Sequence, residues 1–233
     1  MADLSSFPIT TRWPAKDPSV IQLYSFPTPN GQKASIALEE LSLPYEAHRV
    51  TLKDEDVKSD AFLSLNPNNK IPAIIDPDGP HGEPIGLFES GAILLYLAEK
   101  TKKLLGTTEA DRYHTMQWLM FQMGGVGPMF GQLGYFYAHG GKEIEDPRPR
   151  ERYINESRRL LNVVEGQLDG RDWIVGPYTI ADIALAPWLN VFGFYDAKDA
   201  VGWDEFPKVK DYVERFFNRP AVERGRNTPP AEG

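Results

Sequence analysis

Residues 66–94 read NPNNKIPAIIDPDGPHGEPIGLFESGAIL, and they set the architecture of the first part of the chain. Two short apolar runs, 73–76 and 84–88, are separated by a turn rich in Pro, Asp and Gly. A longer apolar run follows over 91–100. Short runs bounded by turn residues predict strands, and the longer run predicts a helix. The expected local order is therefore strand, strand, helix.

The residues before this stretch continue the alternation of strands and helices. We expect a strand over 20–24, a helix over 31–43 that Pro44 ends, and a strand over 45–51. Ser59 is a suitable N-cap for a short helix after that strand. The resulting order, β-α-β-α-β-β-α, is typical of an α/β sandwich with a small mixed sheet.

Beyond residue 109 the pattern predicts helices only. Helical spacing extends over 111–136, with a kink expected at the glycine-rich residues 124–128, and over 149–168. Two more helices are expected, one near Thr179 and one after Pro207. The fold class is therefore α/β plus all-α.

This pattern divides the chain into three parts. We expect an extended N-terminal arm over 1–18, an α/β domain over 19–103 and an all-α domain over 109–226.

The composition describes an acidic chain with enough apolar residues for a core. Of its 233 residues 41% are hydrophobic, and the formal net charge is −8 at pH 7. Because neither Lys nor Arg forms a block, we expect no binding to nucleic acid or to a membrane surface. No run approaches about 18 apolar residues, so no membrane span is expected. The start of the chain lacks the apolar core of a signal peptide, which predicts a cytoplasmic location.

The chain contains no cysteine. Disulfides, thiolate metal sites and a cysteine nucleophile are therefore excluded. The four histidines show no paired spacing of metal ligands, so no metal is expected. Any thiol chemistry must use a thiol that a substrate or cofactor brings.

The tetrapeptide Thr28-Pro29-Asn30-Gly31 lies between the first expected strand and helix. A helix N-terminus presents unpaired N–H groups and a positive dipole potential, which favour an anion. Thr28 and Asn30 would add side-chain donors. Taken alone, these residues also fit a plain turn with a helix cap.

Two further stretches are candidates for binding. Ile71-Pro72 begins a strand with a proline, and a cis bond there would expose the backbone of Ile71 to a ligand. A trans bond is favoured on frequency, because only about 5–6% of X–Pro bonds are cis. Ser90 is expected to cap a helix that starts at Gly91, where it could hold a carboxylate beside Glu89, which could pair with an ammonium. Simple capping is the alternative.

Together the three stretches fit an anionic sulfur, an extended peptide and an amino-acid head group, which glutathione has in that order. The α/β half resembles the thioredoxin-like, glutathione-binding domain of cytosolic glutathione transferases. The resemblance is most specific in residues 28–31, 68–74 and 88–94, and it extends from about residue 20 to 218. These motifs are similar to those of the Nu class, the bacterial disulfide-bond reductases.

The resemblance implies roles for individual residues. Thr28 and Asn30 would act on the sulfur of glutathione, with Ser25 as an alternative donor. Arg152 lies on a basic helix face that could simply be solvated, but the resemblance makes it a contact for glutathione near a dimer interface. The residues expected to bind glutathione are Thr28, Asn30, Lys70, Ile71, Pro72, Glu89, Ser90 and Arg152.

The function expected from the resemblance is glutathione-dependent disulfide reduction by a homodimer. Glutathione is the co-substrate, and the other substrates are small disulfides or electrophiles. Two alternatives stay open: glutathione conjugation or peroxide reduction, for which aromatic residues of the helical half could line an acceptor pocket, and a non-catalytic glutathione-binding regulator. Thr179 and Asp182 have the spacing of a capping box, so Asp182 is expected to be structural rather than catalytic.

Overall fold

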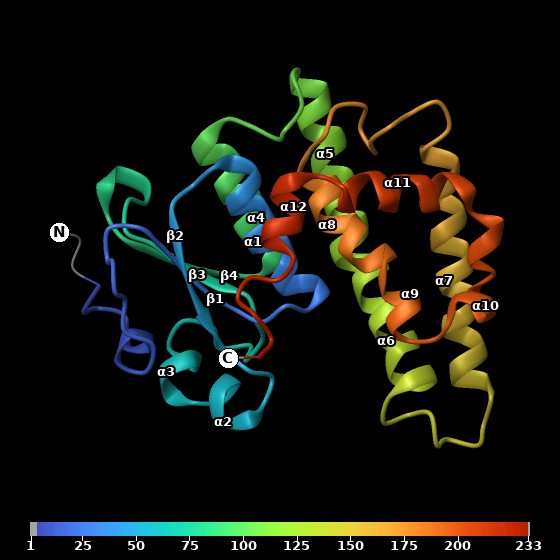
Figure 1. Cartoon of the computed structure of the whole chain (residues 1–233), viewed down its shortest axis with the longest axis horizontal. Coiled ribbons are helices and arrows are strands. Elements are labelled where there is room, and N and C mark those ends of the chain that lie inside the picture. The colour runs from blue at the N-terminus through green and yellow to red at the C-terminus, as the bar shows by residue number, and fades with distance from the viewer. Residues whose placement is uncertain (1–3, 233) are drawn as a thin grey trace. The chain divides into compact units, whose positions relative to one another are not determined.

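The computed structural model describes residues 4–232, which form two compact units (Figure 1). The first unit consists of residues 4–101 together with residues 220–232, and residues 1–3 of the expected N-terminal arm lie outside the described residues. The second unit consists of residues 102–219. None of the helices in the described part of the chain is long and apolar enough to cross a membrane.

The first unit is built on a four-stranded mixed sheet. The strands are β1 (Ile21–Ser25), β2 (Tyr45–Arg49), β3 (Ala73–Asp76) and β4 (Ile85–Phe88), in the order β2-β1-β3-β4. β1 and β2 are parallel, whereas β3 is antiparallel to both β1 and β4. With the helices around this sheet and the helical second unit, the predicted α/β plus all-α fold with a thioredoxin-like first domain is confirmed.

Helices and short helical turns surround this sheet. They are the 3₁₀ turn η1 (Pro8–Thr11), α1 (Pro29–Leu41), α2 (Asp54–Val57), α3 (Asp60–Leu63), the 3₁₀ turn η2 (Pro80–Gly82), α4 (Ser90–Thr101) and α12 (Pro220–Gly225). Ser59 is the N-cap of α3, since its Oγ accepts from the backbone N–H of Phe62 at 3.2 Å. This cap was predicted from the sequence.

The two faces of the sheet are covered by different elements. Side chains alternate between the faces along a strand, so Leu23 and its partner Ile74 lie opposite to Tyr24 and its partner Ala73. α1 and α4 pack on each other and on the strands. Tyr24 and Ala73 belong instead to an apolar cluster that includes Phe62 of α3. α3 therefore contributes to the face opposite to that covered by α1 and α4.

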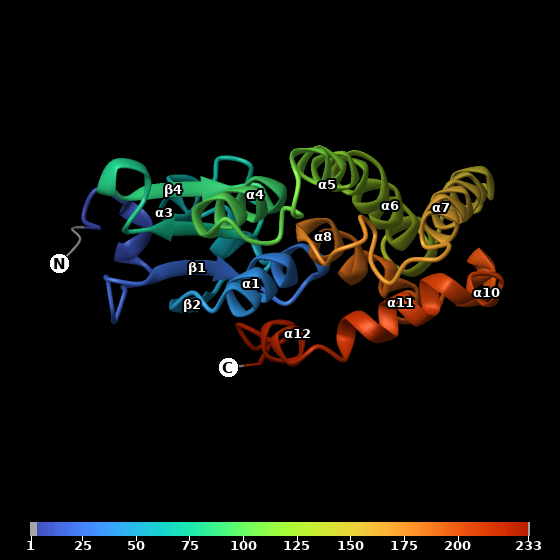
Figure 2. The same cartoon turned by 90° about the horizontal axis from the view of Figure 1, so that it is seen from above.

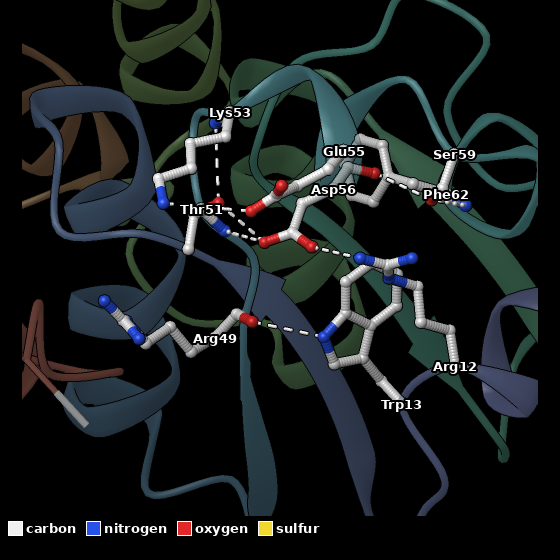
Figure 3. Close-up of polar contacts among 9 residues, drawn as sticks. All are labelled: Arg12, Trp13, Arg49, Thr51, Lys53, Glu55, Asp56, Ser59 and Phe62. Atoms are coloured by element: carbon white, nitrogen blue, oxygen red, sulfur yellow. Dashed lines mark hydrogen bonds and ion pairs between the residues drawn. The ribbon is translucent and has the colours of Figure 1, made fainter.

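The N-terminal arm completes this second face. Leu4 and Ile9 are buried in the same cluster as Tyr24 and Phe62. Beside them, the indole N–H of Trp13 donates to the carbonyl oxygen of Arg49 at 3.1 Å (Figure 3). Apolar burial thus makes the arm part of the core of the first unit.

Polar contacts also attach the arm to α2. The guanidinium of Arg12 donates to Oδ1 of Asp56 at 2.5 Å (Figure 3). The other oxygen of Asp56 accepts from the backbone N–H and the hydroxyl of Thr51, at 2.9 and 2.6 Å. These hydrogen bonds from Thr51 and Arg12 lower the pKa of Asp56 despite its partial burial.

The last helix belongs to the first unit, whereas the sequence placed residues up to 226 in the helical domain. α12 packs beside α1 (Figure 2). The hydroxyl of Ser35 donates to the carbonyl of Gly225 at 2.7 Å, and Arg224 is paired with Glu39 at 2.6 Å. The sequence predicts no separate helix over these residues, and it does not show their contact with α1, because Ser35 and Gly225 are 190 positions apart.

The second unit is entirely helical in its regular structure. Its elements are α5 (Glu109–Phe121), the π-helical turn η3 (Gln122–Val126), α6 (Gly127–Ala138), α7 (Arg148–Gln167), α8 (Ile180–Leu189), α9 (Val191–Phe194), α10 (Lys198–Val201), the 3₁₀ turn η4 (Trp203–Glu205) and α11 (Pro207–Phe217). The π turn η3 interrupts the long helical pattern at the glycine-rich segment where a kink was predicted.

Every residue of α8 is buried, which makes it the central helix of this unit. Its N-terminus carries the predicted capping box of Thr179 and Asp182. The carboxylate of Asp182 accepts from the N–H groups of Thr179 at 2.8 Å and Ile174 at 3.0 Å. It also accepts from the hydroxyl of Tyr212 at 3.0 Å. Asp182 therefore connects three segments of the helical unit, as its structural interpretation requires.

Candidate active site

The turn between β1 and α1 presents the N-terminus of a helix. Thr28 is the N-cap of α1, and its hydroxyl oxygen accepts from the N–H of Gly31 at 3.2 Å. Pro29 follows at the start of the helix, where its missing N–H costs nothing. A hydroxyl that accepts a hydrogen bond can still donate its own proton. Thr28 can therefore cap the helix and donate to an anion at the same time.

Gly31 allows this helix to start directly against the end of β1. A Cβ atom at this position would overlap the carbonyl oxygen of Phe26 and lie 2.6 Å from Oγ of Ser25. Ser25, the alternative donor, is completely buried, and its hydroxyl donates to the carbonyl of Phe26 at 3.5 Å. The buried position of Ser25 favours Thr28 as the residue that meets a ligand.

Ile71 and Pro72, which precede β3, are joined by a cis peptide bond. The prediction of a trans bond, which was based on frequency, is therefore wrong. The side chain of Asn66 holds the loop before it, because its amide donates to the carbonyl of Lys70 and its Oδ1 accepts from the N–H of Asn68 at 2.9 Å. Lys70 is exposed, whereas Ile71 is buried.

The third stretch forms the start of α4. The helix begins at Ser90, one residue earlier than expected, so Ser90 is its first residue rather than the residue before it. Glu89 takes the preceding position, and its carbonyl accepts from the N–H of Ile93 at 2.9 Å. Glu89 has a φ of 70°, a left-handed conformation that is uncommon for a residue other than glycine. Unusual backbone of this kind often occurs at ligand sites.

Lys33 connects the turn that contains Thr28 and Asn30 to the start of α4 at Ser90. Its side chain, on α1, is completely buried. The Nζ atom lies 2.9 Å from Oδ1 of Asn30 and 3.4 Å from Oγ of Ser90. The helix N-termini that carry Thr28 and Ser90 are therefore bridged by one side chain.

Lys33 is not among the site residues predicted from the sequence. One signal was available: Lys33 precedes Ala37 and Leu41 at four-residue intervals, which places it on the buried face of the helix. Burial lowers the pKa of Lys33 to about 7, and the negative charge of Glu89 opposes this shift.

Arg152 belongs to the other unit, on α7. It lines a surface pocket with Arg148, Asn155, Glu156 and Arg159. The charge of Arg159 is paired with Glu156 at 2.7 Å. The pocket thus combines cationic and polar side chains on one exposed helix face.

The aromatic residues considered for an apolar acceptor pocket are divided between core and surface. Trp118 and Phe130 are buried in the helical unit. Tyr135 is exposed, and its ring meets that of Phe136 edge-on at 5.0 Å. Within residues 4–232 no group of three or more His, Cys, Asp or Glu side chains could hold a metal ion.

Comparison with known proteins gives consistent matches for both units. Residues 28–100 match the model of the glutathione S-transferase N-terminal domain, and residues 140–220 match that of the C-terminal domain. The disulfide-bond oxidoreductase YfcG of Escherichia coli (strain K12) is 44% identical over 207 residues, which cover 87% of this chain and 93% of that protein.

Two crystal structures of glutathione transferases are more similar still. That from Burkholderia graminis, with two glutathione molecules bound per subunit, has a TM-score of 0.97 and 58% identity, covering 100% of this chain and 98% of that one. That from Pseudomonas putida, with one glutathione disulfide bound per subunit, has a TM-score of 0.96 and 57% identity, covering 97% of this chain and 99% of that one.

Proposed function

This chain belongs to the glutathione S-transferase family, and we propose that it reduces disulfides with the thiolate of bound glutathione, as a member of the Nu class. The observation that carries the proposal is the pair of helix N-termini that present Thr28 and Ser90 and are bridged by Lys33. The chain has no cysteine, so glutathione must supply the reacting thiol. The protein contributes position and electrostatic stabilisation.

Thr28 and Asn30 act on the sulfur in this proposal. A free thiol titrates near pH 8.5, and lowering its pKa by one unit requires about 1.4 kcal/mol of preferential stabilisation of the thiolate. A hydrogen bond to a charged group contributes about 1.5–3 kcal/mol. The hydroxyl of Thr28 together with the N-terminus of α1 therefore lowers the pKa of the glutathione thiol by about one to two units.

The remaining residues hold the peptide. The backbone of Ile71, between Lys70 and Pro72, pairs with the extended chain of glutathione. Ser90 and the N–H groups of α4 bind the carboxylate of its γ-glutamyl end, and the carboxylate of Glu89 binds the ammonium. These assignments rest on the complementarity between the three stretches and the three parts of glutathione.

The reaction proceeds by two thiol–disulfide exchanges. The bound thiolate attacks one sulfur of a disulfide, a new S–S bond forms, and the other sulfur leaves as a thiolate that takes up a proton. A second glutathione thiolate attacks the glutathione sulfur of this mixed disulfide and releases the second thiol, leaving glutathione disulfide. The two-glutathione and glutathione-disulfide complexes of the similar proteins support this stoichiometry.

A homodimer and a cytoplasmic location are part of the same proposal. A reductase that consumes glutathione requires a compartment in which thiols are kept reduced. Arg152 contributes to glutathione binding near the interface of this dimer. Light scattering on the purified protein would measure the mass of the particle, and a monomer at working concentration would remove the dimer from the proposal.

The deciding experiment is the reduction of hydroxyethyl disulfide by glutathione, coupled to glutathione reductase and NADPH consumption. We expect fast, protein-dependent turnover, which Thr28→Ala lowers at least about tenfold while glutathione still binds in calorimetry. Thr28→Ser keeps the hydroxyl and serves as the matched control. Unchanged turnover in Thr28→Ala would remove the role of Thr28, and absence of turnover in the unmodified protein would contradict the reductase function.

A further inference from the structure

A lysine with a completely buried side chain requires an explanation, because lysine is almost never fully buried unless it is paired. Lys33 is in this position on α1. Its Nζ contacts Asn30, one turn earlier on the same helix, at 2.9 Å. It also contacts Ser90, at the start of α4, at 3.4 Å. Both neighbours belong to the proposed glutathione site, whereas the proposed mechanism assigns Lys33 no role.

The chemistry of an ammonium group restricts how these neighbours can be oriented. An ammonium has three N–H donors and no acceptor. It must therefore meet Asn30 at the carbonyl oxygen of the amide and Ser90 at a lone pair of the hydroxyl. Since the amide is planar, its Nδ2–H₂ group is directed away from Lys33. The proton of the Ser90 hydroxyl is likewise directed away from Nζ.

We propose that Lys33 is a positioning residue that orients Asn30 and Ser90 as hydrogen-bond donors toward the two anionic groups of glutathione, its thiolate and its γ-glutamyl carboxylate. This inference rests on the proposed function. A reversed amide at residue 30 would present its oxygen to the thiolate, and two acceptors repel each other. Lys33 prevents this reversal without contacting the substrate.

The charges around Lys33 fit this role. The carboxylate of Glu89, which precedes α4, is the negative group that favours the charged form of Lys33. On α12, the other helix packed against α1, Arg224 is paired with Glu39 at 2.6 Å. Burial lowers the pKa of Lys33 to about 7, so that an anion bound nearby would favour the protonated form. Glutathione binding and protonation of Lys33 therefore favour each other.

The test is Lys33→Met, which keeps an unbranched side chain and removes the charge. Lys58→Met, at an exposed lysine of the same unit, is the matched control. The ultraviolet absorbance of the thiolate gives the pKa of bound glutathione, and the disulfide assay gives kcat and KM. We expect Lys33→Met to raise this pKa by about one unit and to lower turnover at neutral pH about tenfold. The control should leave both values unchanged.

A double-mutant cycle separates positioning from mere structural support. If Lys33 acts on the thiolate through Asn30, Lys33→Met should lower turnover less than about twofold when Asn30→Ala is already present. Additive losses in the two variants would overturn the inference. An unchanged thiol pKa in folded Lys33→Met would overturn it as well.

A second variant keeps the test decisive if Lys33→Met does not fold. Because the chain has no cysteine, Lys33→Cys introduces a single thiol that can be aminoethylated in the unfolded protein before refolding. This modification restores an ammonium at nearly the original distance. If the aminoethylated protein regains the low pKa of the glutathione thiol, the inference is supported. If it refolds and binds glutathione but keeps the thiol pKa of Lys33→Cys without aminoethylation, the inference is overturned.

The same measurements distinguish this inference from the proposed function. If Asn30→Ala and Thr28→Ala reduce turnover while Lys33→Met does not, the inference fails alone. If none of the three variants changes turnover or the thiol pKa, the site assigned under the proposed function fails, and the inference fails with it.

Discussion

The indole ring of Trp13 lies edge-on to the ring of Tyr24, with the ring centroids 6.3 Å apart and an interplanar angle of 70°. Trp13 belongs to the N-terminal arm, whereas Tyr24 is a completely buried residue of β1. Trp13 meets Phe62 of α3 in the same way, also at 6.3 Å. The arm therefore supplies an aromatic side chain to the apolar cluster of the first unit, on the sheet face to which α3 contributes.

Removal of this side chain should destabilise the first unit. We expect Trp13→Ala to lower the free energy of unfolding by about 2–3 kcal/mol, because a large, partly buried aromatic side chain is lost. Urea unfolding followed by circular dichroism would measure the change. Lys16→Ala, at an exposed position of the same arm, should have an effect below about 0.5 kcal/mol. Equal stability of the two variants would show that the arm is not part of the core.

Local sequence patterns predicted most helices and strands of this molecule, whereas contacts between residues far apart in the sequence were not predicted. The caps at Ser59 and Thr179 were predicted because an N-cap is specified by residues within one helical turn. The contact between Lys33 and Ser90 joins residues 57 positions apart, so no short window of sequence shows it. The packing of the arm on the sheet was not predicted, because it depends on single apolar residues such as Leu4 and Ile9, without a helical or strand period.

The candidate site was also predictable only where local sequence patterns indicate it. Thr28 and Ser90 were identified because each lies at a strand-to-helix junction, where helix N-termini attract anions. The isomer of the Ile71–Pro72 bond was missed, since frequency favours trans and the surrounding tertiary structure decides the outcome. Lys33 is not among the predicted site residues, since a lysine in a helix is ordinarily solvated.

Gly31 provides a test of the close approach between β1 and α1. We expect Gly31→Ala to displace the turn of Thr28, because the new methyl group would overlap a backbone oxygen of Phe26 that has no freedom to rotate away. Glutathione affinity should fall by about tenfold or more, a loss of about 1.4 kcal/mol. Calorimetric titration of glutathione would measure the effect.

The control for this substitution is Gly166→Ala, since nothing lies within 4 Å of a Cβ atom at that position of α7. Alanine has a higher helix propensity than glycine, so this variant should be slightly more stable. Its affinity for glutathione should be unchanged. Wild-type affinity in Gly31→Ala would mean that the turn does not shape the site.

The buried position of Lys33 predicts a dependence of stability on pH. Its pKa is about 7 in the folded chain, compared with an ordinary value of 10.5. Between these values the unfolded chain binds more protons, so the free energy of unfolding should increase as the pH is raised. The increase cannot exceed about 1.4 kcal/mol per pH unit for one group, and the gain is lost again as the pH falls toward 7.

Urea unfolding of the unmodified protein and of Lys33→Met at several pH values between about 7 and 9 would isolate this contribution. The difference between the two proteins should grow in favour of the unmodified chain as the pH rises. Parallel curves would contradict the expected titration of Lys33. Lys58→Met, at an exposed lysine, should give a curve parallel to that of the unmodified protein.

Asp182 gives the sharpest prediction for the helical unit. In Asp182→Ala the N–H groups of Thr179 and Ile174 and the hydroxyl of Tyr212 lose their buried acceptor. Each unsatisfied buried group costs about 1–3 kcal/mol, so we expect a loss of about 4 kcal/mol or more in the free energy of unfolding. Asp211→Ala, at an exposed position of α11, should change it by less than about 0.5 kcal/mol. If Asp182→Ala instead unfolded at the same urea concentration as the unmodified protein while losing turnover, the carboxylate would have a catalytic rather than a structural role.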